Sequence, residues 1–275
     1  MFIEASTLKK FSLRALDDEL GAVDDLIFEG PNFKIRYIEA DTRRWLPGGH
    51  VFLSPAAFTE LNRENETIGV QLTKEQIKDS PKPSEFTLTR EFEKSLNSHY
   101  GWDNYWLHPL ALPRTHGPTF VGQTPQSPII PPIREYDEKT LPDERDQTTK
   151  TNRQQVPQDN ETLLQSFNDL YKYELHAKNG EVGQIVDCII DYEDHFIRYF
   201  IIDVGGFMSK ELVVLSTEWI TEISHIDKTV TVSNIDQSLI SNAPEYERET
   251  LFDREQEQII YQHYHMQPYW ETSIK

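Results

Sequence analysis

The chain contains an internal duplication, and this feature limits the possible folds more than any other. The segment ELGAVDDLIFEGPNFKIRYIEADT, which begins at Glu19, aligns without a gap to EVGQIVDCIIDYEDHFIRYFIIDV, which begins 162 residues later at Glu181. At the same offset, VFLS from Val51 recurs as VVLS from Val213. A match of this length predicts that one structural unit occurs twice in the chain.

Four kinds of residue stand at matching places in the two copies and are interpreted as structural. A glycine inside a strand usually marks a bulge or a sharp bend. Each matched aspartate lies five residues after the matched arginine, and we expect it to cap the next turn or to pair with a cation of its own copy. A catalytic acid and base pair would instead require both carboxylates to meet in one cleft. The matched pairs are Gly21 with Gly183, Arg36 with Arg198, Tyr37 with Tyr199, and Asp41 with Asp203.

Within each copy, short β-type segments alternate with turn sequences. In the first copy the segments are FSLRAL, LGAVDDLIF, FKIRYIEADT, HVFLS and TIGVQL, which predict five strands in a small closed barrel. TKEQIKDSP follows, and its Thr73 and Gln76 form a capping-box pattern that predicts a short helix. Asn234 and Gln237 hold the corresponding places in the second copy.

Each copy ends in an aromatic tail, HYGWDNYW at 99–106 and HYHMQPYW at 263–270. Apolar residues spaced four apart before the first tail predict an amphipathic helix that leads into it. The rings could cover an apolar patch on a barrel or on the other copy, which we favour, or form a stacking platform. His99, His263 and His265 could instead bind a metal. Trp102, Trp106 and Trp270 are the candidate interaction residues here.

The segment between the copies has a different composition. Residues 107–160 hold nine of the sixteen prolines, followed by the polar run DERDQTTKTNRQQ. Such a segment buries too little apolar surface to offset the entropy lost on ordering. We therefore expect a first repeat at 1–106, an extended or disordered linker at 107–160, and a second repeat at 161–275.

The charge of the chain argues against several classes of partner. The formal net charge is −19, which disfavours contact with nucleic acid or with anionic lipid. The residues after Met1 lack the basic and apolar regions of a secretory leader, and no apolar stretch is long enough for a membrane span. Cys188, the only cysteine, lies in an apolar run and is expected to be buried. These observations predict a soluble cytoplasmic protein.

These motifs resemble the PRC-barrel family, named for the H subunit of photosynthetic reaction centres and shared by the ribosome maturation factor RimM. The resemblance rests on Gly21, VDDLIF, IRYIEADT, RRWLPGG, VFLSP and LTKEQIKDSP. More closely, the chain resembles bacterial tandem PRC-barrel proteins with aromatic tails. The resemblance implies a mainly β fold of two small PRC-type barrels in tandem, each followed by a short helix and an aromatic tail helix. It also implies docking to other proteins and no known catalysis.

One loop is a candidate interaction site. RRWLPGG places Arg43, Arg44 and Trp45 at a predicted hairpin tip, and arginine and tryptophan are frequent hot-spot residues of interfaces. Trp45 could equally fold back over its own barrel. The second copy has GGFMSKEL in this place, so the two copies need not bind alike.

No pattern in the sequence predicts catalysis. No nucleophile elbow, phosphate-binding glycine loop or repeated serine, histidine and acid set is present, and DYEDH at 191–195 lacks the glycine of a calcium loop. We therefore predict a non-catalytic adaptor without cofactor or bound metal, which binds a protein partner, forms an intramolecular pseudo-dimer and could self-associate. The alternatives are a RimM-like ribosome or RNA-processing adaptor and a metal or small-ligand binding protein.

Overall fold

A computed structural model describes most of the chain outside the central segment. The described residues are 1–30, 32–46, 49–82, 88–107, 164–205, 210–232, 234–248 and 251–272. The predicted linker, residues 107–160, lies outside them except for Leu107.

The first half is a series of short strands that ends in two helices. Its elements are β1 (Phe2–Glu4), α1 (Ala5–Leu8), β2 (Ser12–Arg14), β3 (Glu19–Glu29), β4 (Lys34–Asp41), β5 (His50–Leu53), the 3-10 turn η1 (Pro55–Ala57), β6 (Phe58–Asn62), β7 (Thr67–Val70), α2 (Lys74–Lys78), α3 (Arg90–Tyr100) and the 3-10 turn η2 (Tyr105–Leu107). The capping box of Thr73 and Gln76 is present at the start of α2, so this prediction is confirmed.

The second half repeats this order of elements. They are β8 (Leu164–Ser166), α4 (Phe167–Leu170), β9 (Glu174–Ala177), β10 (Gly180–Asp191), β11 (Phe196–Asp203), β12 (Leu212–Ser216), the 3-10 turn η4 (Thr217–Trp219), β13 (Ile220–Ser224), β14 (Thr229–Val232), α5 (Gln237–Ser241), α6 (Arg254–His263) and α7 (Tyr269–Thr272). Helix α5 starts after Asp236 and has no side-chain cap, unlike the predicted box at Asn234. Within the described chain, no helix combines the length and the apolar character needed to cross a membrane.

The strands form one open sheet, so the mainly β prediction is confirmed and the expectation of closed barrels is corrected. In the described residues the sheet has 14 strands, and its main path runs β13-β14-β9-β10-β11-β4-β3-β2-β7-β6. In the described residues β5 pairs with β4 and β6 with β7, but β5 and β6 share no ladder. The 3-10 turn η1 connects β5 to β6, so that the two strands belong to different ladders. Within the part of each half that the structure describes, six strands follow the first short strand, where five were predicted.

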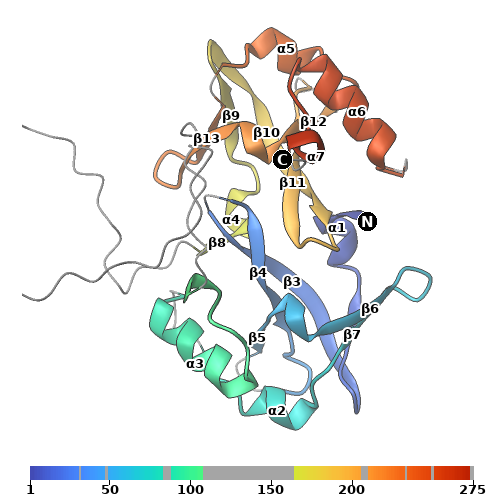
Figure 1. Ribbon diagram of the computed structural model, residues 1–275, viewed down its shortest axis with the longest axis vertical. Helices are drawn as coiled ribbons and strands as arrows, with labels where there is room; N and C mark the ends of the chain where they lie inside the picture. Colours follow the sequence, from blue (N-terminus) through green and yellow to red (C-terminus); the bar gives the residue numbers. More distant parts are fainter. Residues whose placement is uncertain are drawn as a thin grey trace, which may run out of the picture.

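The two halves exchange their first strands, which the sequence did not predict. Strand β1 of the first half pairs with β10 of the second, with Phe2 opposite Asp191. Strand β8 of the second half pairs with β3 of the first, with Leu164 opposite Glu29. In Figure 1, α1 accordingly lies beside the upper half, and β8 and α4 lie beside β3 and β4. Each half therefore completes the sheet of the other.

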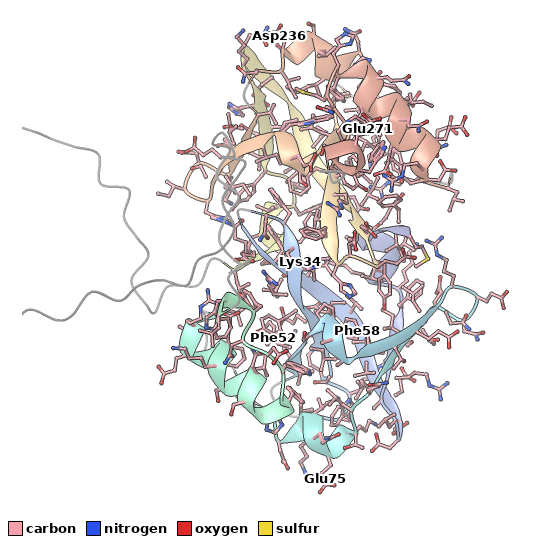
Figure 2. The ribbon with its side chains drawn as sticks, in the orientation of Figure 1. Lys34, Phe52, Phe58, Glu75, Asp236 and Glu271 are labelled. Atoms are coloured by element: carbon pink, nitrogen blue, oxygen red, sulfur yellow. The ribbon has the colours of Figure 1, made fainter. Side chains whose placement is uncertain are left out.

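The two halves also contact each other reciprocally where β4 meets β11, a region called the joint below. Strands β4 and β11 meet at Lys34 and Phe196, and Lys34 lies where the two halves join (Figure 2). Ile35 donates its backbone N–H to the carbonyl of His195 over 2.8 Å, and Ile197 donates to the carbonyl of Phe33 over 3.0 Å. Because both bonds join residues at matching places, they relate the halves by an approximate twofold rotation.

Two buried aspartates hold the exchanged segments in place. Asp25 accepts the backbone N–H of Asn168 over 3.0 Å, and Asp187 accepts that of Ser6 over 3.1 Å. Asp25 and Asp187 stand at matching places in the repeats, and both are buried. Since a buried carboxylate is tolerated when it is hydrogen-bonded, each aspartate fixes the turn that follows the exchanged strand of the other half.

The hydrophobic core runs across the joint without a break. The ring of Phe33 stacks on Phe28 of its own half with centroids 5.5 Å apart and meets the edge of Phe200, from the other half, at 5.7 Å. Apolar side chains of both halves belong to one buried cluster. The halves are thus packed as parts of one core.

The matched glycines permit a close approach between strands. A Cβ atom on Gly21 would lie 1.9 Å from the carbonyl oxygen of Asp41, and one on Gly183 would lie 2.1 Å from that of Asp203. The strand register shifts next to both positions. Only a residue without a side chain fits there.

We therefore expect Gly21→Ala and Gly183→Ala each to destabilise the protein by about 3 kcal/mol, because the strands must separate to admit the methyl group. Gly101→Ala is the control: this residue has φ +72° but no atom near its missing Cβ, so only the backbone cost of about 1 kcal/mol applies. Urea unfolding measures all three. Equal losses for the three variants would contradict the close-approach explanation.

The strand exchange predicts that a change in β1 loosens the second half. Ile3 is buried and lies opposite Ile190, so Ile3→Ala should cost about 2–4 kcal/mol. Hydrogen exchange should rise at residues 189–191, which pair with β1. Ile226→Ala is the control, since Ile226 is 96% exposed and its truncation should change stability by less than about 0.5 kcal/mol. Unchanged exchange at 189–191 would argue against the exchanged strand.

Candidate functional site

The aromatic tails fold back onto the half to which they belong. Phe92 and Leu96 of α3 are buried in a cluster with Ile27, Tyr37 and Phe52 of the sheet, and Figure 2 shows Phe52 facing α3. The ring of Tyr100 stacks on that of Trp102 with centroids 4.3 Å apart. The tail helix thereby covers one face of the sheet.

A buried glutamate organises the first tail. Glu93 is fully buried; its carboxylate accepts the hydroxyl of Tyr105 over 2.8 Å and pairs with Arg90 at 2.7 Å. The guanidinium of Arg36 lies 3.7 Å from the centre of the Tyr105 ring, and that of Arg90 lies 4.3 Å from the centre of the Trp106 ring. Two cations and two rings thus enclose one carboxylate.

The second tail repeats this arrangement around Glu257, which is also fully buried. Glu257 accepts the hydroxyls of Tyr199 over 2.6 Å and Tyr269 over 3.0 Å, and pairs with Arg254 at 2.7 Å. Arg198 lies 4.3 Å above the Tyr269 ring. The matched Arg36 and Arg198, together with Tyr37 and Tyr199, therefore lie beside the tails.

Several other tail residues contact an arginine or a backbone carbonyl. Arg254 lies 4.2 Å from the centre of the Trp270 ring, in the same relation as Arg90 to Trp106. His99 Nε2 lies 2.9 Å from the carbonyl of Gln76, and His263 Nε2 lies 2.7 Å from that of Leu239. Each imidazole thus ties its tail helix to the short helix before it.

In the loop after β4, the arginine side chains are exposed and the tryptophan is hydrogen-bonded to its own half. Arg43 and Arg44 have exposed side chains, whereas the indole N–H of Trp45 donates to the carbonyl of Leu20 over 2.5 Å. Arg43 also bonds Asp41 through its guanidinium and its backbone N–H, which lowers the pKa of that carboxyl to about 2. The loop therefore offers cations rather than an indole ring. Residues 47–48 lie outside the described structure.

In the second half, Asp203 has a more local partner, the backbone N–H of Gly205 at 3.1 Å. Half of GGFMSKEL, residues 206–209, lies outside the described residues. Asp41 and Asp203 each bond the loop that directly follows their own strand.

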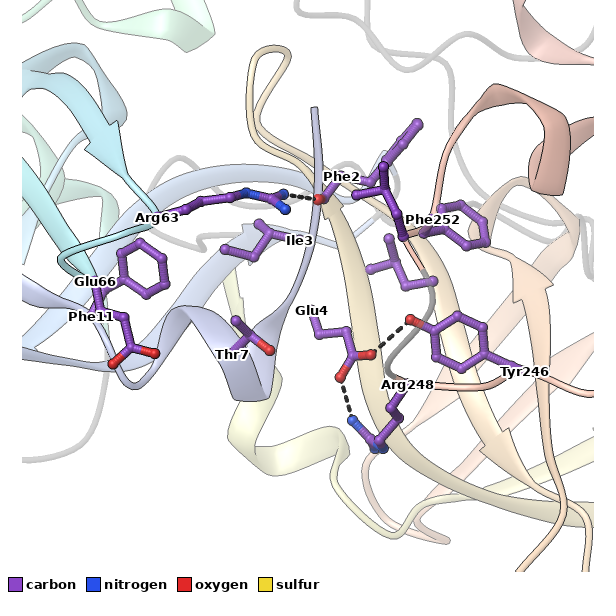
Figure 3. A pocket seen from close by; sticks show the side chains of 12 residues that line it. Phe2, Ile3, Glu4, Thr7, Phe11, Arg63, Glu66, Tyr246, Arg248 and Phe252 are labelled. Atoms are coloured by element: carbon purple, nitrogen blue, oxygen red, sulfur yellow. Dashed lines mark hydrogen bonds and ion pairs between the residues drawn. The ribbon is translucent and has the colours of Figure 1, made fainter.

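A groove of about 350 Å³ lies at the joint between the halves (Figure 3). Strand β1 runs along it, with the turn between β6 and β7 on one side and the segment before α6 on the other. Its lining combines apolar side chains, including Ile3, Phe11 and Leu251, with two arginines, Arg63 and Arg248. Pockets of this size that combine apolar walls with a few polar groups are typical of binding sites.

Arg248 pairs with Glu4 of the groove lining and with the nearby buried Asp187. One of its guanidinium nitrogens lies 2.5 Å from both Glu4 and Asp187. Tyr246 donates its hydroxyl to Glu4 over 2.7 Å, and burial raises the pKa of this hydroxyl. On the opposite wall, Arg63 donates to the carbonyl of Phe2 over 2.6 Å. Sequence reasoning missed this cluster because its members come from three distant segments and show no common spacing.

One group of described side chains has the composition of a metal site. Asp24, Glu39 and His50 each offer a ligand atom, and these atoms lie within 4.8 Å of one another. None of the three was a sequence candidate.

The tail network predicts a pH-dependent effect of Glu257. Burial raises the pKa of Glu257 in the folded protein above its value in the unfolded chain. The protonated carboxyl therefore stabilises the fold at pH values below the pKa of the unfolded chain. This stabilisation is lost as the pH rises through the pKa of the folded protein. Glu257→Gln lacks this titration. The stability of the variant relative to the native protein should therefore increase from pH 4 to pH 8 in urea unfolding. Glu255→Gln, at an exposed position of the same helix, should differ by less than about 0.5 kcal/mol throughout. A constant difference for Glu257→Gln would contradict the prediction.

Comparison with known proteins identifies one region of the chain. Residues 166–239 match the family model of the PRC-barrel domain. No curated protein matches the chain. The matched region runs from the end of β8 into α5 and includes the strands of the second half. The chain is therefore similar to a PRC-barrel domain over most of its second half.

Proposed function

We propose that the protein is a non-catalytic adaptor that binds a protein partner in the groove at the joint. The observation that carries this proposal is the position of the groove, which both halves line. A partner seated there would contact β1, the β6–β7 turn and the segment before α6 at once. Binding of the partner would then stabilise the association of the two halves, and the associated halves would bind the partner more tightly than separated ones.

The lining of the groove suits a protein segment. Leu251 is 63% exposed, and the rings of Phe2 and Phe252 pack edge to face at 5.4 Å. An exposed leucine beside fixed rings and paired charges resembles the composition of an interface, where apolar contact is bordered by polar groups. The net charge of −19 favours approach by a partner with a basic face.

Several reactive groups of the described residues are enclosed or paired, which supports a non-catalytic role. Burial raises the pKa of the Cys188 thiol well above its usual value. Glu93 and Glu257 are enclosed in the tails, and Arg248 pairs both with Glu4, which lines the groove, and with the buried Asp187. A general base requires a carboxylate that is open to substrate, and these carboxylates are already paired.

The second part of the proposal concerns architecture. We infer that both halves are PRC-type units arranged in tandem. The support is the matching order of elements, the ungapped sequence repeat and the tail networks around Glu93 and Glu257. The exchanged strands would then make the chain an intramolecular pseudo-dimer of such units.

Leu251→Asp tests the adaptor function. Affinity purification with crosslinking, from cells that express the protein, should recover one reproducible protein partner with the native chain and lose it with the variant. Ile226→Asp is the matched control, because Ile226 is an exposed apolar residue on the turn between β13 and β14, away from the groove. It should retain the partner.

Equal recovery by both variants would overturn the assignment of the groove. Recovery of ribosomal subunits instead of a single protein would favour the RimM-like alternative, and sedimentation with purified subunits would verify it. Circular dichroism of both variants establishes that each is folded before the comparison is made.

A further inference from the structure

Three side chains with metal-binding atoms stand on three neighbouring strands of the first half. Asp24 lies on β3, Glu39 on β4 and His50 on β5. Strand β4 pairs with both of the others, so the backbone holds the three positions at fixed spacing. The β3–β4 register shifts between Val23 and Asp25, which makes Asp24 the extra residue of a bulge. A bulge redirects side chains relative to a regular strand.

The distances between the donor atoms suit a small divalent ion. His50 Nδ1 lies 2.8 Å from an oxygen of Glu39 and 3.6 Å from one of Asp24. An ion with ligand distances of about 2.0–2.2 Å holds neighbouring donors about 3–3.5 Å apart. The two distances from Nδ1 are therefore close to this spacing, and the Asp24 and Glu39 oxygens lie within 4.8 Å of each other.

The nitrogen of His50 lacks an adequate partner without such an ion. Nδ1 is buried, and its contact with Glu39 is not aligned as a hydrogen bond, so this atom has no hydrogen-bond partner among the described residues. A buried polar atom in this state is costly. The imidazole as a whole remains 34% exposed, which leaves a path for an ion and space for water ligands.

The electrostatics of the group also favour a cation. Two carboxylates face one imidazole, so that a neutral imidazole leaves two negative charges side by side. The guanidinium of Arg43 does not compensate this charge, because it bonds both oxygens of Asp41. A divalent ion would neutralise the remaining charge.

The second half provides an internal comparison. The positions that match Asp24, Glu39 and His50 at the offset of 162 residues hold Val186, Ile201 and Leu212. These apolar residues occupy the same strand pairs, including a bulge at Val186. The sheet therefore forms without the polar group, and packing does not explain its presence in the first half.

We propose that Asp24, Glu39 and His50 bind one divalent transition-metal ion of the zinc type, with water in the remaining positions. One imidazole and two carboxylates suit such ions, whereas Ca²⁺ prefers six to eight oxygen ligands. This site is separate from the groove and does not depend on the adaptor function.

The test measures zinc binding to the untagged full chain by isothermal titration calorimetry at pH 7.5. We expect one equivalent of Zn²⁺ to bind. His50→Leu, which installs the residue of the second half, should weaken binding at least about tenfold, since loss of groups that only support a ligand already costs that much. Co²⁺ should give a d–d absorption spectrum that disappears in the variant.

His176→Ala is the matched control. His176 Nε2 lies 3.5 Å from Glu174 and the pair is similarly exposed, but it is not part of a three-ligand group among the described residues. This variant should bind zinc like the native protein. Glu39→Gln and Asp24→Asn provide the same test if His50→Leu does not fold. Absence of zinc binding, or binding that is unchanged in the folded ligand variants, would overturn the proposal.

Discussion

The exchange of β1 and β8 between the halves is the constraint on which the rest of the structure depends. The long strands β3 and β10 each receive, on one edge, the first strand of the other half. An unpaired edge with exposed N–H and C=O groups would promote aggregation, and the exchange removes part of it from both strands. Separation of the halves would expose these edges together with the core around Phe33 and Phe200. The same exchange creates the groove, because β1 reaches across the joint.

The two tails show how a duplicated unit tolerates buried charge. Glu93 and Glu257 are fully buried, yet each has an arginine and at least one tyrosine as partner. Removing one partner of a buried ion pair is costly because the other charge is left uncompensated. The network is similar in both halves, with one difference: Tyr37 donates its hydroxyl to Asn97 in the first half, and Tyr199 donates its hydroxyl to Glu257 in the second.

At other matching backbone positions, the side chains of the two halves differ. The joint places Arg248 against Glu4 and Asp187, whereas Asp25 meets Ser166 and the backbone of Asn168. The β3–β5 face carries a polar group that the β10–β12 face lacks. The repeated backbone supplies the positions, and the side chains at a few of them differentiate the surfaces available for binding.

The sequence by itself determined the duplication, most of the strands, the capping box at Thr73 and the tail helices. These features depend on local chemistry: an alternating apolar pattern, a hydroxyl before a helix, and apolar residues spaced four apart. It also indicated a PRC-type pattern in both halves, and the family comparison supports this pattern for residues 166–239.

Only the tertiary structure decided the open path of the sheet, the strand exchange, the groove and the group at His50. Strands β1 and β8 have three residues each, too few to show a period, and their partners lie far away in the chain. Asp24, Glu39 and His50 come together because a bulge and two strand registers align them. Registers and bulges follow from hydrogen bonding between distant segments, and a linear pattern does not contain that information.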